Sequence, residues 1–211
     1  MPDSTQPENE RTMMQEIFDV IFDLAMPFLD TRENKTHTRI SCRFAERLLK
    51  KEGGDPHVVY PALILHDVGW KCIPEDLQLS AFGPGDKDMK LNRIHEIEGA
   101  RIARDILEQV RYPQHLIKEI TDIIIGHDSR KIAISINDAV VKDADKLWRY
   151  SEDGARINAL RFALSFSQNL DRLRKKLDEW FITRTGLTIA KEELRLRESS
   201  LDRLSAPSHS L

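Results

Sequence analysis

Residues 55–70 read DPHVVYPALILHDVGW, and this stretch decides the fold class. Asp55 followed by Pro56 is typical of a helix start, because aspartate caps a helix and proline fits its first position. The apolar run that follows predicts a buried helix, and Gly69 marks its end. His66 and Asp67 lie at that end, where two consecutive side chains can both reach one centre.

The rest of the chain repeats this helical pattern. Apolar residues recur at intervals of three and four, and no segment shows the alternation typical of a strand. We therefore expect an all-α protein, a compact bundle of seven to nine helices. The expected helices cover about 12–28, 35–51, 56–69, 91–110, 113–127, 136–150, 153–183 and 188–197.

The length of 211 residues fits a single domain. We place that domain at residues 11–198, after a disordered segment 1–10 that is polar, acidic and rich in proline. Residues 199–211 are expected to fray. Within the domain, residues 153–198 form the C-terminal helices.

Composition excludes several classes of protein. The 32 basic and 35 acidic residues give a net charge of −3, which argues against a nucleic-acid scaffold. No apolar stretch is long enough to span a membrane, and the N-terminus does not resemble a secretory signal. Cys42 and Cys72 are too few for a disulfide framework. These features together predict a cytoplasmic protein without a membrane partner.

Four histidines share the apolar faces of four separate expected helices: His37, His66, His95 and His127. One such histidine is more often a hydrogen-bonded core residue than a metal ligand. The set is different, because Asp145 also lies on an apolar face and Asp67 follows His66. Burying these groups without compensation costs several kcal/mol each.

A divalent metal removes that cost. Imidazole and carboxylate ligands without a thiolate suit iron, manganese, nickel, cobalt, magnesium or zinc. Six ligands suffice for two ions if one carboxylate bridges them. The sequence therefore predicts divalent metal ions as the cofactor, two in number.

The order His37, His66-Asp67, Asp145 resembles that of the HD superfamily of metal-dependent phosphohydrolases. Three flanking segments resemble the family as well: THTRISCRFAERLL, ALILHDVGW and KDADKLWRY. The resemblance covers residues 34–150. It implies that these four residues hold one ion, that Asp67 bridges, and that His95 and His127 hold a second ion.

The subgroup with two metals includes phosphohydrolases and di-iron oxygenases. The segment GHDSRKIAI lacks the paired histidines and Gly-Tyr-Pro signature of the cyclic-dinucleotide branch. No tyrosine precedes Tyr60, which counts against the phosphonate-cleaving oxygenases. We expect a phosphohydrolase that uses metal-activated water on a small phosphate ester, with nucleotides as the first class to examine. A di-iron oxygenase and a non-catalytic module that binds a nucleotide or a protein remain alternatives.

Further residues are candidates because they neighbour the ligands in sequence. Lys71, Arg93, Arg130 and Lys131 are expected phosphate contacts, and Asp67, Glu96 and Lys71 are the expected catalytic groups. Glu96 and Asp128 each adjoin a ligand histidine, where a carboxylate orients an imidazole or moves a proton. Lys146 is expected to be structural.

Two segments carry less specific expectations. Residues 79–89 form a loop that is either a lid over the substrate or a plain connector. The charged helix FSQNLDRLRKKLDEW is either a solvated face or the surface of a homodimer.

Overall fold

The computed structural model describes residues 6–82 and 88–205, and this part of the chain contains helices and no strand. The all-α prediction is confirmed. Within these ranges there are ten α-helices: α1 (Gln6–Leu29), α2 (Asn34–Glu52), α3 (Pro56–Leu65), α4 (Glu75–Gln78), α5 (Met89–Gln109), α6 (Gln114–Ile124), α7 (Ile136–Leu147), α8 (Glu152–Arg161), α9 (Phe166–Trp180) and α10 (Arg184–Ser205). Three short 3-10 helices join them: η1 (Val68–Cys72), η2 (Leu79–Ala81) and η3 (Trp148–Tyr150).

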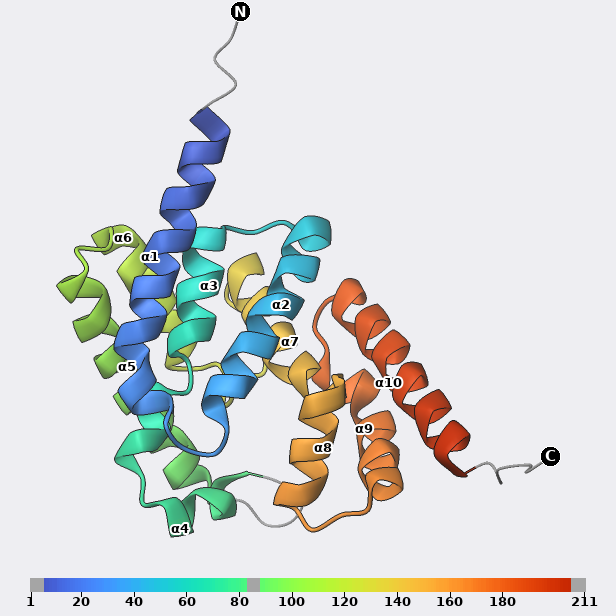
Figure 1. The fold of residues 1–211 in the computed structure, drawn as a ribbon. Helices are drawn as coiled ribbons and strands as arrows, with labels where there is room; N and C mark the ends of the chain where they lie inside the picture. The colour runs from blue at the N-terminus through green and yellow to red at the C-terminus, as the bar shows by residue number, and fades with distance from the viewer. Residues whose placement is uncertain (1–5, 83–87, 206–211) are drawn as a thin grey trace, which may run out of the picture.

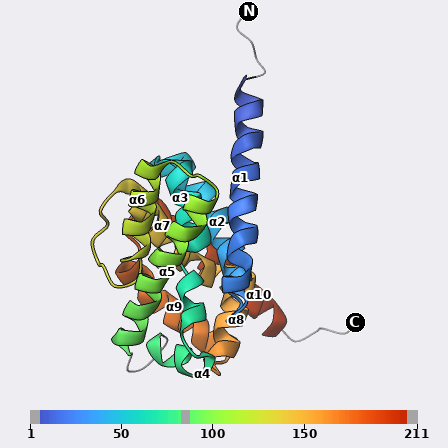
Figure 2. The ribbon, with the colours of Figure 1, turned by 90° about the vertical axis from the view of Figure 1, so that its left-hand side faces the viewer.

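Helix α3 is the centre of the bundle. It packs against α1, α2, α6 and α7, and its residues from Val58 to Leu65 are buried apart from Tyr60, which is half-buried. Asp55 caps its N-terminus, where the carboxylate accepts a 2.8 Å hydrogen bond from the backbone N–H of His57. Helices α8, α9 and α10 form a separate group to one side, and the first turns of α1 rise beyond the body of the bundle (Figures 1 and 2).

Two ends of the chain are more helical than expected. Helix α1 begins at Gln6, inside the segment we expected to be disordered, because its Gln, Glu, Arg and Met residues are good helix formers. It continues past Pro27 and ends at Leu29. Helix α10 runs to Ser205, into the segment expected to fray. Residues 1–5 and 206–211 lie outside the described part of the chain.

The single helix expected over 153–183 is two helices. Ala163 has a φ of 50°, in the left-handed region, and this ends α8. Ser165 and Gln168 then form a capping box that starts α9. This break and the short helix α4 explain why the described residues contain more helices than expected.

Glycine allows the closest packing in the fold. A Cβ at Gly69 would lie 1.9 Å from the carbonyl oxygen of His95, so η1 rests directly on the backbone of α5. This contact places His66 and Asp67 beside His95. Residues 83–87, the middle of the expected loop, lie outside the described part. No helix within that part is both long and apolar enough to cross a membrane.

Candidate metal centre

The six predicted ligands meet at one buried place, although they come from separate parts of the chain. Helices α2, α5 and α7 supply His37, His95 and Asp145, while His66 and Asp67 follow the last residue of α3. His127 lies three residues beyond the end of α6. All six are at most 5% exposed, so they form a buried cluster of polar side chains surrounded by the apolar core.

His37, His66 and Asp145 form the first group of possible ligands. The Nε2 atoms of the two histidines are 2.9 Å apart. The Oδ1 atom of Asp145 lies 3.2 Å from Nε2 of His37 and 3.6 Å from Nε2 of His66. One ion between these atoms would contact all three residues.

His95 and His127 form the second group, with their Nε2 atoms 3.3 Å apart. The structure adds a carboxylate that the sequence did not assign as a ligand. Oδ2 of Asp128 lies 3.9 Å from Nε2 of His95 and 3.8 Å from Nε2 of His127. Asp128 is therefore a seventh possible ligand.

Asp67 lies between the two groups. Its Oδ2 atom is 3.7 Å from Nε2 of His66, and its Oδ1 atom is 3.7 Å from Nε2 of His127. Each oxygen of one carboxylate thus faces a different pair of histidines. This is the arrangement that a bridging carboxylate requires.

The histidine rings are oriented for metal binding. Nδ1 of His66 lies 2.7 Å from the carbonyl oxygen of Leu63, and Nδ1 of His127 lies 2.8 Å from that of Ile124. Because a carbonyl only accepts, each Nδ1 carries a hydrogen and donates it. In the neutral ring, Nε2 then presents its lone pair to the cluster, as in metal-binding histidines. The donor set and its orientation fit divalent metal ions.

The charges of the cluster also fit a cation. Burial favours the neutral carboxyl, but His66 and a hydrogen bond from His127 hold the pKa of Asp67 well below its usual range. Lys146 and Arg149 likewise hold the pKa of Asp145 well below its usual range against the effect of burial.

The pKa values of the buried imidazoles are shifted in opposite directions. Burial lowers the pKa of His37 and of His95 to about 4. Burial also opposes the charged form of His127, but the carboxylates of Asp128 and Asp67 raise its pKa to about 9. The ionised carboxylates thus stabilise a positive charge on His127, and the same charges would attract a metal cation.

Neighbouring side chains hold the ligands in place. Nζ of Lys146 donates to Oδ1 of Asp128 at 2.8 Å and also contacts Asp145. Arg149 lies 3.5 Å from Oδ1 of Asp145. The indole N–H of Trp70 donates to Oδ1 of Asp67 at 3.0 Å. Loss of such a supporting contact typically weakens metal binding about 10–100-fold.

Glu96, one of the expected catalytic groups, has both carboxylate oxygens occupied. It is fully buried, and Oε1 accepts hydrogen bonds from the backbone N–H groups of Asp128 and Ser129 at 2.9 and 2.8 Å. Oε2 accepts from the Ser129 hydroxyl at 2.7 Å and from Arg93 at 2.9 Å. Glu96 therefore anchors the segment that carries Asp128 and is not placed as a proton carrier.

The four expected phosphate contacts are exposed or bonded to other groups. Lys71 is exposed with its Nζ 3.5 Å from the carbonyl oxygen of Asp30, and Lys131 is exposed. Arg93 bonds to Glu96 and the Ile125 carbonyl, and Arg130 bonds to Asp138 and the Asp122 carbonyl. Among the described residues, no hydrogen bond or ion pair joins any of the four to a predicted ligand. Their role as phosphate contacts therefore stays a prediction that rests on proximity in sequence alone.

Other arginines lie closer to the centre. The guanidinium of Arg32 covers the ring of Trp70 at 4.1 Å from its centroid, and the charge of Asp67 acts on it. Arg149 contacts Asp145. Arg161 lies 5.6 Å from the ring centroid of Trp148, which packs on His37. Only Arg149 had a usable sequence signal, since it lies one helical turn after Asp145.

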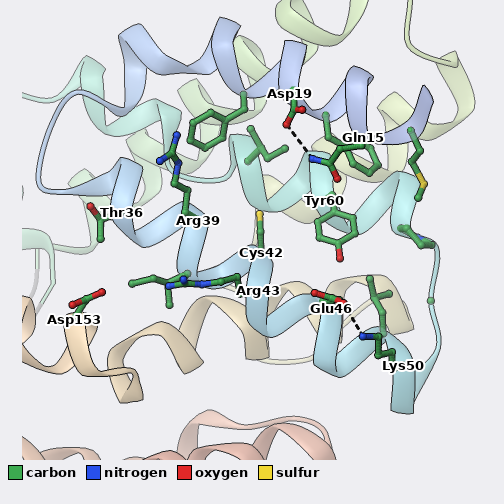
Figure 3. Close-up of a pocket in the computed structure, with 18 residues that line it drawn as sticks. Gln15, Asp19, Thr36, Arg39, Cys42, Arg43, Glu46, Lys50, Tyr60 and Asp153 are labelled. Atoms are coloured by element: carbon green, nitrogen blue, oxygen red, sulfur yellow. Dashed lines mark hydrogen bonds and ion pairs between the residues drawn. The ribbon is translucent and has the colours of Figure 1, made fainter. Parts of the chain in front are cut away.

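A cavity of about 1190 Å³ lies elsewhere, between α1, α2 and α3 (Figure 3). Its lining includes Arg39, Cys42 and Tyr60 and none of the six predicted ligands. Burial raises the pKa of both Cys42 and Tyr60 to about 12, so neither is ionised near neutral pH. The cavity is therefore separate from the metal centre.

Comparison with known proteins identifies the family through the region that holds the ligands. Searches of the curated proteins and of the solved structures return no match. The family model described as HD domain matches residues 35–150, which is more than half of the chain and includes all six predicted ligands. Members of this family are generally metal-dependent phosphohydrolases. The chain belongs to the HD domain family.

Proposed function

We propose that this protein is a metal-dependent phosphohydrolase with two metal ions, acting on a small phosphate ester such as a nucleotide. One observation carries the proposal. The two oxygens of Asp67 face two separate pairs of histidines, His37 with His66 and His95 with His127. A single ion would leave one of these pairs without a function.

The ligand set assigns each site. His37, His66, Asp67 and Asp145 would hold one ion, and Asp67, His95, His127 and Asp128 would hold the other. Iron, manganese, nickel, cobalt, magnesium and zinc all suit such donors to different degrees. A bound divalent pair supplies an activated water near neutral pH and polarises the phosphoryl oxygen.

The protein's own groups prepare this chemistry. Lys146 and Arg149 keep Asp145 ionised and oriented, and Trp70 directs one oxygen of Asp67. The large rings of Trp70 and Trp148 are at most 2% exposed, so they exclude water from the ligands behind them. Preorganised charges in such a dry site act more strongly than in water.

Metal content and hydrolysis together test the proposal. The full chain, purified without added metal or chelator, should contain two metal ions. With Mn²⁺ present it should release phosphate from p-nitrophenyl phosphate or from nucleoside monophosphates. Asp67→Asn should lower the rate by more than about a hundredfold, since even changes to groups that only support metal ligands cost 10–100-fold.

A matched control and two contrary outcomes complete this test. Asp105→Asn changes an exposed carboxylate of α5 that pairs with Arg101, and it should leave the rate unchanged. An Asp67→Asn variant with the full rate would refute the site. Dioxygen uptake by an iron-loaded protein that releases no phosphate would favour the oxygenase alternative, which uses the same ligands.

A further inference from the structure

Four arginines from four elements gather beside the candidate metal centre. Arg32 precedes α2, Arg149 belongs to η3, Arg161 ends α8, and Arg172 lies in α9. Their positive charges act on one another. Burial lowers the pKa of Arg32 to about 9 and of Arg161 to about 10, and the charge of Arg149 lowers both further. Arg172 is affected in the same way by burial and by Arg149.

Like charges brought together in a half-buried place destabilise the folded protein unless an opposite charge joins them. The nearby carboxylates do not supply it. Asp67 acts on Arg32 and Arg161, but its two oxygens already face the histidine pairs. Asp128 also acts on Arg32 but pairs with Lys146, and Glu33 acts on Arg161 but is exposed to solvent. Arg149 forms an ion pair with Asp145, but the same carboxylate also pairs with Lys146. The cluster therefore has an excess of positive charge.

Arg32 is held rigidly and keeps free donors. Its guanidinium lies between the rings of Trp70 and Phe82, 4.1 and 3.8 Å from their centroids. Its Nε and Nη1 atoms are buried and have no hydrogen-bond partner. The guanidinium of Arg161 donates a hydrogen bond to the backbone carbonyl oxygen of Arg32. A buried donor without a partner destabilises the fold, and a ligand oxygen would offset that cost.

The backbone at Arg32 is strained as well. Arg32 and Glu33 have φ values of 52° and 58°, two consecutive left-handed residues that are not glycine. Such backbone conformations are unfavourable for residues other than glycine, and this strain is concentrated at functional sites. The Arg32 side chain that follows from this backbone lies on the two aromatic rings.

Arg172, like Arg32, combines an aromatic contact with a buried donor that has no partner. It lies 5.0 Å from the ring centroid of Phe162, and its Nη1 atom is buried without a partner. Phe162 in turn packs edge-on against Phe82 with ring centroids 5.8 Å apart. The two arginines with unpaired donors thus rest on one continuous aromatic surface, formed by Trp70, Phe82 and Phe162.

Trp70 separates Arg32 from the predicted ligand His95. His95 stacks on the indole with centroids 4.1 Å apart, and the guanidinium of Arg32 stacks on the same indole at 4.1 Å. Two groups this close to one centroid cannot share a face, so they occupy opposite faces. A group bound by Arg32 lies beside the metal centre and not between the metal ligands.

We propose that Arg32, Arg149, Arg161 and Arg172 form a subsite for a second, non-reacting phosphate group of the substrate. The substrate class is then a phosphate ester with at least two phosphates. One arginine suffices to pair with a carboxylate, whereas a phosphate offers more charge and several acceptor oxygens to forked guanidinium groups. The proposal rests on the proposed hydrolysis but makes a separate prediction about binding.

Binding of inorganic pyrophosphate to the full chain, with its metal as purified, tests the subsite by calorimetry. Arg172→Gln should raise the dissociation constant about tenfold, on the scale of one charge-assisted hydrogen bond. Arg172→Lys, which keeps the charge but loses the fork, should fall in between. Arg174→Gln is the matched control, because Arg174 lies on the same helix and pairs with Asp171 and Glu198. Metal content checks that each variant is folded.

Kinetics separates this inference from the proposed function. The wild type should prefer adenosine 3′,5′-bisphosphate over adenosine 5′-monophosphate by about tenfold in kcat/KM, and Arg172→Gln should reduce that ratio. Arginine-dependent pyrophosphate binding without hydrolysis of either nucleotide would refute the hydrolase and leave the subsite standing. Hydrolysis without preference, with equal pyrophosphate binding in Arg172→Gln and Arg174→Gln, would overturn the subsite alone. Equal affinity for pyrophosphate and citrate would overturn its assignment to phosphate.

Discussion

The indole of Trp70 lies flat against the imidazole of His95, with ring centroids 4.1 Å apart and an interplanar angle of 13°. This contact orients a ring whose Nδ1 atom is buried without a hydrogen-bond partner. Packing against Trp70 thus takes the place of the carbonyl contact that orients His66 and His127. The same indole also donates to Asp67, so one side chain positions two predicted ligands.

Trp70→Ala should therefore damage the second metal site and the fold together. Loss of a fully buried indole is expected to cost about 3–5 kcal/mol of stability. Trp70→Phe keeps an aromatic ring against His95 but loses the donor to Asp67. We expect the phenylalanine variant to retain two ions with weaker affinity. Thermal unfolding and metal analysis measure both effects, and an alanine variant with normal stability and metal content would contradict this role.

His95→Ala should lower the metal content by one ion per chain. The first group of ligands does not include His95, so its ion should remain. The control is His115→Ala, since His115 is an exposed histidine of α6. Metal analysis after dialysis against a weak chelator gives the stoichiometry. An unchanged count in His95→Ala would mean that His95 is a core or substrate residue.

Glu96→Ala should weaken the second metal site without removing a ligand. Two backbone N–H groups, those of Asp128 and Ser129, would lose their acceptor, and Asp128 would lose its fixed position. Metal affinity should fall about 10–100-fold, as expected for a supporting group. Glu96→Gln keeps an oxygen acceptor and should recover part of the loss. Glu98→Ala, on the same helix and paired with Arg101, should have no such effect.

Gly69→Ala should separate η1 from α5. The new methyl group would lie 1.9 Å from the carbonyl oxygen of His95, a contact that only backbone movement relieves. We expect a loss of at least about 1–3 kcal/mol, as for an overpacked core, together with weaker binding of the second ion. Gly53→Ala provides the comparison. Gly53 has a φ of 78° and open space around it, so that variant should lose about 1–2 kcal/mol and keep both ions.

Side-chain periodicity was sufficient to predict that the four histidines and Asp145 of the candidate set are buried. His37, His95 and Asp145 lie on helical faces whose other residues are apolar, and each of these side chains is buried as expected. The lysine and arginine side chains near the centre were not predictable from periodicity. Lys71 and Lys131 adjoin the motifs in sequence but are exposed, whereas Arg161 and Arg172 come from helices outside the motifs. Their approach depends on how α8 and α9 pack, which no local pattern encodes.

A local sequence signal marks the break between α8 and α9, which the single helix expected over 153–183 did not include. The segment Ser165–Gln168 has the Ser-x-x-Gln pattern of a capping box, and it does start α9. The apolar period continued across this position and concealed the break. From the sequence, Asp128 is expected only to orient the imidazole beside it or to move a proton. The chain has already left α6 at that point, so both side chains reach the same centre.

The predicted ligands and most of the clustered arginines lie in different parts of the chain, and this separation affects how the protein can evolve. Residues 35–150 hold every predicted ligand, while Arg32, Arg161 and Arg172 lie before or after that region. Mutations in the flanking segments can alter which molecule is accepted and leave the reaction chemistry intact. A lineage built on this core can therefore diversify its substrates through its ends, and orthologues should vary more in those arginines than in the histidines.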